Sequence, residues 1–296
     1  MVIRLFARRS NITMHPHSTE KYIELFKKAL SLNNSTMYQA NHYALIGSFH
    51  PVVEEEKGEG FHGGIYRFLN FESGEPWINL SENKEASEED LEEVNIPDNL
   101  RPGYHSNNYI FFPKEHLLFF ERSSSGQKAL GPKHAKKIFE NLLNQKELTE
   151  KYGRVDVTIE PSYEALDKIL KMPTLSKLKL TVTKPNPDFF GSGTDQEVEA
   201  RFKALNAKNF ETELTAEKNE SLTPDEGIRS LANVAASNGK VIGSGYDENG
   251  IRKQESTENH PYIETVKYDP DTQGIMGMLI TKAKQMKTTL MDRRNQ

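Results

Sequence analysis

The stretch YIFFPKEHLLFFE at residues 109–121 decides the fold. Two apolar, aromatic runs, 109–112 and 117–121, flank the polar segment 113–116, which begins with Pro113. Short apolar runs bounded by turn residues are typical of strands that are buried in a sheet. Proline followed by polar residues suits the tight connection between two such strands. The stretch therefore predicts a β-hairpin inside a sheet.

Working outward from this hairpin, alternating and periodic patterns predict further strands and helices on both sides. Ser18 is a helix N-cap, because a run with apolar spacings of three and four follows it. The predicted strands are 2–7, 43–49, 61–71, 154–159 and 178–183, with a second hairpin at 240–246 and 250–254. The predicted helices are 20–30, 133–150, 163–170, 194–209, 224–236 and 272–290.

This order of elements predicts an α+β protein with a ferredoxin-like sheet, antiparallel or mixed, and with helices on one face. A smaller, mainly helical part is expected to follow it. We expect the first domain to span 1–187 and the second to span 188–296, because Pro185 and Pro187 close the last strand of the sheet. An insertion near 72–101 interrupts the first domain, and seven acidic residues against one lysine in 82–93 predict a solvated, acidic segment.

Composition excludes several classes of protein. The 296 residues include no cysteine, which rules out disulfides, thiolate metal sites and cysteine nucleophiles. The start of the chain lacks the pattern of a secretory signal, and no apolar run is long enough to span a bilayer. We therefore expect a cytoplasmic protein without membrane insertion. The net charge of −5 argues against a uniformly basic surface.

The candidate catalytic groups do not form a complete motif. His15 and His17 are a close pair, but two ligands do not make a metal site. The glycines of 60–64 and 243–245 lack the sequence of a phosphate loop and are interpreted as turns. Asp156 and Glu160 lie on one face of a predicted strand, where they could bind a divalent ion if Asp167 or Lys177 approached. We assign no catalytic residue, no metal and no cofactor.

Basic residues form three groups along the chain, at its start, in its middle and near its end. If the fold brings two groups together, they would form a stripe that binds phosphates. Lysines on exposed helix faces are the alternative explanation. The predicted nucleic-acid contacts are Arg4, Arg8, Arg9, Lys133, Lys136, Lys137, Arg154, Lys282, Lys284 and Lys287.

Several segments also resemble a bacterial domain-of-unknown-function family of about 300 residues. They are YHSNNYIFF at 104–112, LGP at 130–132, IEP at 159–161, PNP at 185–187, SNG at 237–239 and DENG at 247–250. The layout of the elements is similar to that of the phage lambda Rex exclusion protein A and of the DNA-binding subunit of the bacterial Kiwa defence system. The resemblance implies a phage-defence protein that binds DNA without strong sequence preference, as a homodimer and without catalysis. It transfers no site residue.

Three functions follow from these observations. The first is a bacterial anti-phage defence protein that binds nucleic acid, with DNA favoured, through its basic patches. The second is a metal-dependent nuclease effector that uses Asp156 and Glu160. The third is a protein–protein interaction module of a defence complex, with a partner protein from the same operon, in which the acidic segment either mimics a nucleic-acid backbone or docks onto a second subunit.

Overall fold

The computed structural model describes residues 8–14, 18–53, 59–71, 75–92, 94, 96–122, 129–184, 193–265 and 274–294. The predicted strand 2–7, the pair His15 and His17, and Arg4 lie outside these residues. Among the helices that are described, none combines the length and the apolar character needed to cross a bilayer.

The described strands form two principal sheets, and every pairing within them is antiparallel. The larger sheet has the order β10-β1-β9-β8-β5-β3-β2, with β4 beside β5, and the smaller sheet has the order β12-β11-β13-β14. The strands of the larger sheet are β1 (Arg8–Met14), β2 (Thr36–Gln39), β3 (His42–Ile46), β4 (His50–Pro51), β5 (Phe61–Leu69), β8 (His105–Phe112), β9 (Leu117–Phe120) and β10 (Val155–Ile159). Those of the smaller sheet are β11 (Thr174–Thr183), β12 (Asn209–Thr215), β13 (Gly239–Tyr246) and β14 (Arg252–Ser256).

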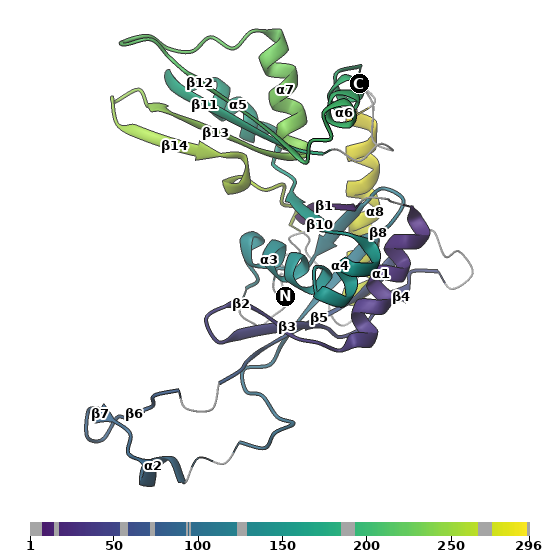
Figure 1. Ribbon diagram of the computed structural model, residues 1–296, viewed down its shortest axis with the longest axis vertical. Helices are drawn as coiled ribbons and strands as arrows, with labels where there is room; N and C mark the ends of the chain where they lie inside the picture. Colours follow the sequence, from purple (N-terminus) through teal and green to yellow (C-terminus); the bar gives the residue numbers. More distant parts are fainter. Residues whose placement is uncertain are drawn as a thin grey trace.

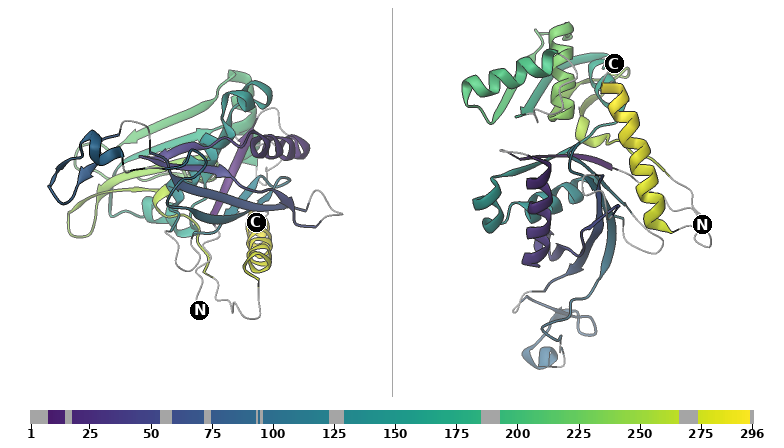
Figure 2. Two further views of the ribbon diagram at one scale, coloured as in Figure 1. Left: turned by 90° about the horizontal axis from the view of Figure 1, so that it is seen from below. Right: turned by 90° about the vertical axis from the view of Figure 1, so that its right-hand side faces the viewer.

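Helices cover both faces of the larger sheet, which lies between them in Figure 2. The helices are α1 (Thr19–Leu32), α2 (Glu88–Glu92), α3 (Pro132–Leu143), α4 (Lys146–Tyr152), α5 (Tyr163–Leu170), α6 (Gly193–Leu205), α7 (Glu226–Ser237) and α8 (Ile275–Arg294), with a 3₁₀ turn, η2, at Thr257–Asn259. The predicted α+β class with an antiparallel sheet is confirmed.

The central hairpin explains why both faces need a cover. Successive side chains of a strand point to opposite faces, and 109–112 and 117–120 are apolar at every position. Tyr109 and Phe111 pack with α1, α3 and α4, whereas Ile110 and Phe112 pack against α8. A strand that is apolar on both faces is stable only when both are buried. The predicted hairpin at 109–121 is confirmed as β8 and β9.

On the α8 face, four side chains of that helix lie against the hairpin. They are Leu279, Ala283, Met286 and Leu290, spaced by four, three and four residues. This spacing places them on one stripe of the helix. The last helix of the chain therefore completes the core of the sheet formed by its first half (Figure 1).

The predicted helix 133–150 is wrong as a single element, because α3 ends at Leu143 and α4 begins at Lys146. Asn144 lies between them. Its side chain accepts a hydrogen bond from Val155 N (2.8 Å) and donates one to Val155 O (2.7 Å). Because β10 is an edge strand, these bonds satisfy backbone groups that have no neighbouring strand, and they stop the helix at this residue.

The interpretation of the glycines of 60–64 and 243–245 as turns is also wrong. Gly63 and Gly64 lie inside β5, and Gly243 and Gly245 lie inside β13. A Cβ atom at Gly63 would lie 2.0 Å from the carbonyl oxygen of Ser48. This glycine therefore permits a close approach of two backbone segments within the sheet.

The division at residue 187 remains a prediction. In the structure, β11 precedes this position and pairs with β12 and β13, which follow it. Strand β12 was not predicted from the sequence. Its exposure alternates residue by residue, with its apolar side chains facing a core that also contains α6 and α7.

The acidic insertion projects from the larger sheet between β5 and β8. It contains the hairpin of β6 (Ile78–Asn79) and β7 (Lys84–Glu85), followed by α2. Both Figure 1 and the right-hand view of Figure 2 show this segment away from the two sheets. We call residues 70–104 the arm. The predicted solvated character of the insertion is confirmed, since none of the arm's described residues is buried.

Candidate functional site

A buried arginine lies at the end of β5, beside the root of the arm. Arg67 is 5% exposed. It lies two residues after Ile65 and therefore on the same face of β5, the face that α1, α3 and α4 cover. Its Nε donates a hydrogen bond to Asn107 Oδ1 on β8, at 2.7 Å. Asn107 is also buried and donates to the carbonyl oxygens of Glu121 and Arg122. The sheet thus fixes a permanent positive charge at this end of its core.

The N-terminal end of α3 lies next to this arginine. Gly131 is the N-cap and makes no side-chain capping bond, Pro132 is in the first turn, and no acidic residue lies in that turn. The first backbone N–H groups of a helix lack internal partners and carry partial positive charge. The helix therefore adds positive potential at its first turn, which contains Lys133 and His134.

His134 shows which side chains converge here. Partial burial lowers its pKa, and the nearby charges of Lys137, Arg67 and His42 lower it further. The Tyr38 ring contacts the imidazoles of both His134 and His42, with centroid separations of 5.7 and 6.0 Å. Among the described residues, no carboxylate shifts the His134 pKa, and Arg67 and Lys137 are the two permanent cations beside it. We call Arg67 and Lys137, together with the neighbouring His42 and His134, the cationic cluster.

Two predicted nucleic-acid contacts extend from this cluster towards solvent. Lys133 and Lys137 are exposed on α3, and neither forms an ion pair with another described residue. An exposed lysine without a carboxylate partner keeps its full charge available to an anion. These two lysines therefore form the accessible edge of the cluster.

The remaining predicted contacts are differently placed. Four of them lie in ion pairs: Lys136 with Glu258 (3.0 Å), Arg154 with Asp156 (3.6 Å), Lys282 with Glu264 (3.2 Å) and Lys287 with Glu115 (2.8 Å). Lys284 is half-buried on α8, and no described carboxylate pairs with it. Arg8 and Arg9 lie in β1, but their side chains are outside the described part of the chain.

The basic groups of α3 and α8 do not share a surface. Helix α3 packs with Tyr109 and Phe111, and α8 packs with Ile110 and Phe112, which point to the opposite face of β8. The larger sheet therefore separates the two groups, so that the middle and last groups do not form one phosphate-binding stripe.

The carboxylates of the nuclease hypothesis do not form a metal site in the part of the chain that is described. Asp156 pairs with Arg154, and Glu160 is buried just beyond the end of β10. No three His, Asp or Glu side chains among the described residues are placed to hold a metal ion. His50 and His62 lie close together, with ring centroids 5.7 Å apart, but they are only two potential ligands.

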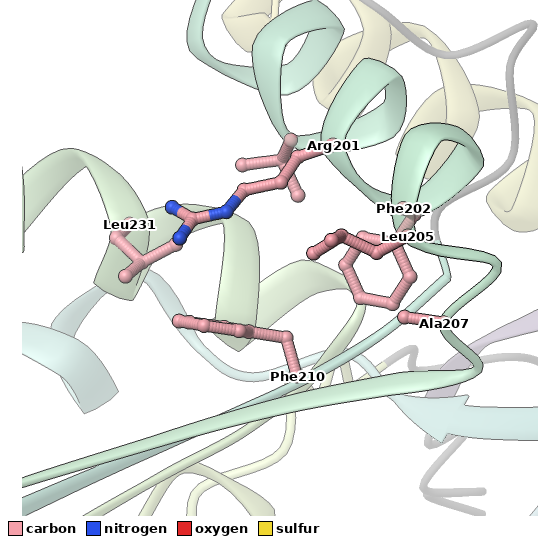
Figure 3. A pocket seen from close by; sticks show the side chains of 7 residues that line it. Arg201, Phe202, Leu205, Ala207, Phe210 and Leu231 are labelled. Atoms are coloured by element: carbon pink, nitrogen blue, oxygen red, sulfur yellow. The ribbon is translucent and has the colours of Figure 1, made fainter.

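A small apolar cavity lies in the second half of the chain, between α6, α7 and β12 (Figure 3). Its volume is about 70 Å³, and its walls include Phe202, Leu205 and Leu231. The Arg201 guanidinium extends over the Phe210 ring, 5.6 Å from its centroid. Ligand pockets are usually several times larger. The cavity is therefore smaller than the usual ligand pocket, and we assign no site to it.

Arg67, Asn107 and His42 were not predicted from the sequence as members of the site. Arg67 did carry a signal, because it follows Ile65 by two residues and therefore occupies a core position of its strand. A charged residue at such a position is rare unless it is paired. The partnership with Asn107 joins two strands and has no local sequence pattern.

Comparison with known proteins gives a family. A family model described as Domain of unknown function (DUF4747) matches residues 7–284. The chain belongs to the DUF4747 family. The match covers both sheets and half of α8, and it extends over the cationic cluster and the arm, so these are parts of the DUF4747 region of the chain. No curated protein of known function matches the sequence.

Proposed function

We propose that this DUF4747 protein binds nucleic acid through phosphate contacts at the cationic cluster and at Lys133. The observation that supports this is the convergence of Arg67 from β5 and Lys137 from α3 beside His134, with no carboxylate among the described groups that shift its pKa. Phosphate groups are the anions that such sites attract, and the positive end of α3 adds to the attraction.

The proposed binding carries little sequence preference. Lysine contacts to phosphates fix the position of a nucleic acid without reading its bases. Arg67 and Asn107 are held inside the sheet rather than on a helix or ribbon that could enter a groove. We propose DNA as the preferred ligand, because the predicted order of elements in the sequence resembles that of the Kiwa DNA-binding subunit and this resemblance implies DNA binding.

A binding titration against salt tests this proposal. Fluorescence anisotropy with labelled duplex DNA, single-stranded DNA and RNA should show affinity that falls steeply as salt rises. The variant Lys133→Glu/Lys137→Glu should lose most of the affinity, and its log–log salt slope should be shallower by about two. Lys208→Glu/Lys218→Glu, which changes two exposed lysines near the smaller sheet, is the matched control. Equal affinity of both variants would refute the site, and no binding at low salt would refute the function.

The cellular role that we propose is defence against phage. It is what the sequence resemblance to the Rex exclusion protein A and the Kiwa DNA-binding subunit implies. Expression in a susceptible bacterial host should lower the efficiency of plaque formation, and the Lys133→Glu/Lys137→Glu variant should lose that protection. Equal protection by the variant would separate the cellular role from the cationic cluster.

A further inference from the structure

The arm exposes an unusual amount of apolar surface. Eight of the fourteen large apolar side chains that are exposed among the described residues belong to it: Phe71, Trp77, Ile78, Leu80, Val94, Ile96, Leu100 and Tyr104. Leu80, at 78%, is the most exposed of the fourteen. An isolated two-stranded hairpin has marginal stability in water, and clustered exposed apolar residues mark an interaction surface.

Among the described residues, polar contacts hold the arm together and tie it to the sheet at its root. Within the arm, Asn79 and Ser87 hydrogen-bond the Asp90 carboxylate, and these bonds lower the Asp90 pKa. At the root, Asn41 donates to Glu75 Oε2 at 3.0 Å, and Arg101 donates to Asn70 Oδ1 at 2.6 Å. The tip, with β6, β7 and α2, lies away from the body (Figure 1).

Charge identifies the surface that fits the arm. Residues 70–104 carry ten acidic and two basic residues, a net charge of −8. The whole chain carries −5, so the rest of the chain carries +3. The acidic arm is therefore opposite in charge to the rest of the chain taken as a whole, and to Arg67, Lys133 and Lys137 at the cluster in particular. Opposite charge steers two surfaces together.

The position of the cluster relative to the arm makes an exchange between two copies possible. Arg67 pairs with His105 in the register of β5 and β8, and Leu69 N donates to Pro102 O, so the cluster lies at the root of the arm. Two copies related by a two-fold axis can place their arms side by side and head to tail. The tip of each arm then meets the cluster of the other copy, and the apolar side chains of both arms bury one another.

We propose that this protein forms a homodimer by reciprocal arm exchange, in which the acidic arm of one copy occupies the cationic cluster of the other. The cluster is the one described under the proposed function, so arm and nucleic acid compete for it. In the dimer, each cluster is occupied by the arm of the other copy and does not bind nucleic acid. A polyanion with a higher charge density than the arm displaces the arm and frees the cluster.

Self-association of the full chain is the first test. Sedimentation velocity at low salt and high protein concentration should show a dimer that dissociates as salt rises. Trp77 is the chain's single tryptophan and lies on the arm, so its emission should shift to the blue with increasing concentration. Leu80→Ser should raise the dimer dissociation constant at least about tenfold. Ile251→Ser, at an exposed apolar residue in the connection between β13 and β14, should not change it. A monomer at every concentration, or an unchanged dimer for Leu80→Ser, would overturn the proposal.

A charge swap tests the pairing itself. Glu89→Lys/Glu92→Lys makes the arm less acidic, and Lys133→Glu/Lys137→Glu makes the cluster less basic. Each variant alone should dimerise more weakly than the wild type, because the substituted positions place like charges opposite one another. An equimolar mixture should regain association as a heterodimer, since in one interface the lysines introduced at 89 and 92 meet the glutamates introduced at 133 and 137, and the other interface is that of the wild type. A mixture that associates no more tightly than either variant alone would contradict arm exchange.

Nucleic-acid binding separates the two proposals. The Glu89→Lys/Glu92→Lys variant keeps the cluster, so it should bind DNA more tightly than the wild type once the competing arm is weakened. If the mixture forms a heterodimer but no variant binds nucleic acid, arm exchange stands and the proposed function fails. If the protein binds DNA but neither the wild type nor the mixture associates, the proposed function stands and arm exchange fails.

Discussion

Arg67 Nε donates a hydrogen bond to Asn107 Oδ1 across the β5–β8 pair, at 2.7 Å and out of contact with water. The bond orients the buried charge of the cationic cluster, and Asn107 in turn is fixed by the carbonyl oxygens of Glu121 and Arg122. The proposed binding site and the sheet interior therefore depend on the same asparagine.

Replacing this asparagine should destabilise the protein. Asn107→Ala removes the Oδ1 acceptor of a buried guanidinium and the donor of two backbone carbonyls, and the loss of a buried charge's partner costs about 3 kcal/mol or more. Urea unfolding should show the change. Asn108 is the next residue of β8 and points to the opposite face. Asn108→Ala also removes a hydrogen bond, the one that this side chain donates to the Glu121 carboxylate. It should leave nucleic-acid affinity unchanged, whereas Asn107→Ala should weaken it.

Glu121 should make stability depend on pH. Burial raises the pKa of this carboxyl, although hydrogen bonds from Asn108 oppose the effect. The folded protein therefore holds the proton at pH values where the unfolded chain has lost it, so stability falls as pH rises from about 4.5 towards the folded pKa. Glu121→Gln cannot ionise, and its stability relative to the wild type should increase over this range.

Urea midpoints measured from pH 4 to pH 8 test this, with Glu217→Gln as an exposed control whose curve should follow the wild type. A Glu121→Gln protein that is less stable than the wild type at pH 8 would show that the ionised carboxylate is favoured inside the sheet.

Helix α8 should be an integral part of the fold. Leu279 is 1% exposed against the outer face of β8 and β9, so Leu279→Ala should cost about 2 to 5 kcal/mol. The exposed Gln285 on the same helix provides the control, because Gln285→Ala should change stability by less than about 0.5 kcal/mol. Thermal unfolding of both variants distinguishes a packed helix from an appended one, for which the two substitutions would have equal effects.

Two glycines should respond to alanine in opposite directions. Gly63→Ala forces a Cβ atom against the Ser48 carbonyl oxygen and should destabilise the protein by about 3 kcal/mol or more. Gly277 lies in α8 with no atom near the position of an added Cβ, so Gly277→Ala should stabilise by about 0.5 to 1 kcal/mol. Calorimetry of the two variants tests both. A tolerated alanine at Gly63 would contradict the close approach of Ser48 to β5.

The sequence by itself determined the elements whose signals are local. Ser18 caps α1 through a bond with Lys21 N, the aromatic runs of 109–121 form β8 and β9, and the acidic run of 82–93 stays in solvent. Each depends on a cap, an alternation or a charge density that neighbouring residues carry. The predicted lysines at 133 and 137 were found in the same way, as exposed positions of an amphipathic helix.

Tertiary structure alone decided which of these pieces meet. The side chain of Asn144 ends α3 because β10, an edge strand, lies beside it, and Arg67 becomes part of a site because Asn107 lies on the paired strand. The basic groups of α3 and α8 are separated because alternate side chains of one strand, Phe111 and Phe112, point to opposite faces. Such contacts join residues far apart in the chain, and the free energy that selects them comes from burying a shared core. A pattern among neighbouring residues therefore does not predict which of these distant contacts form.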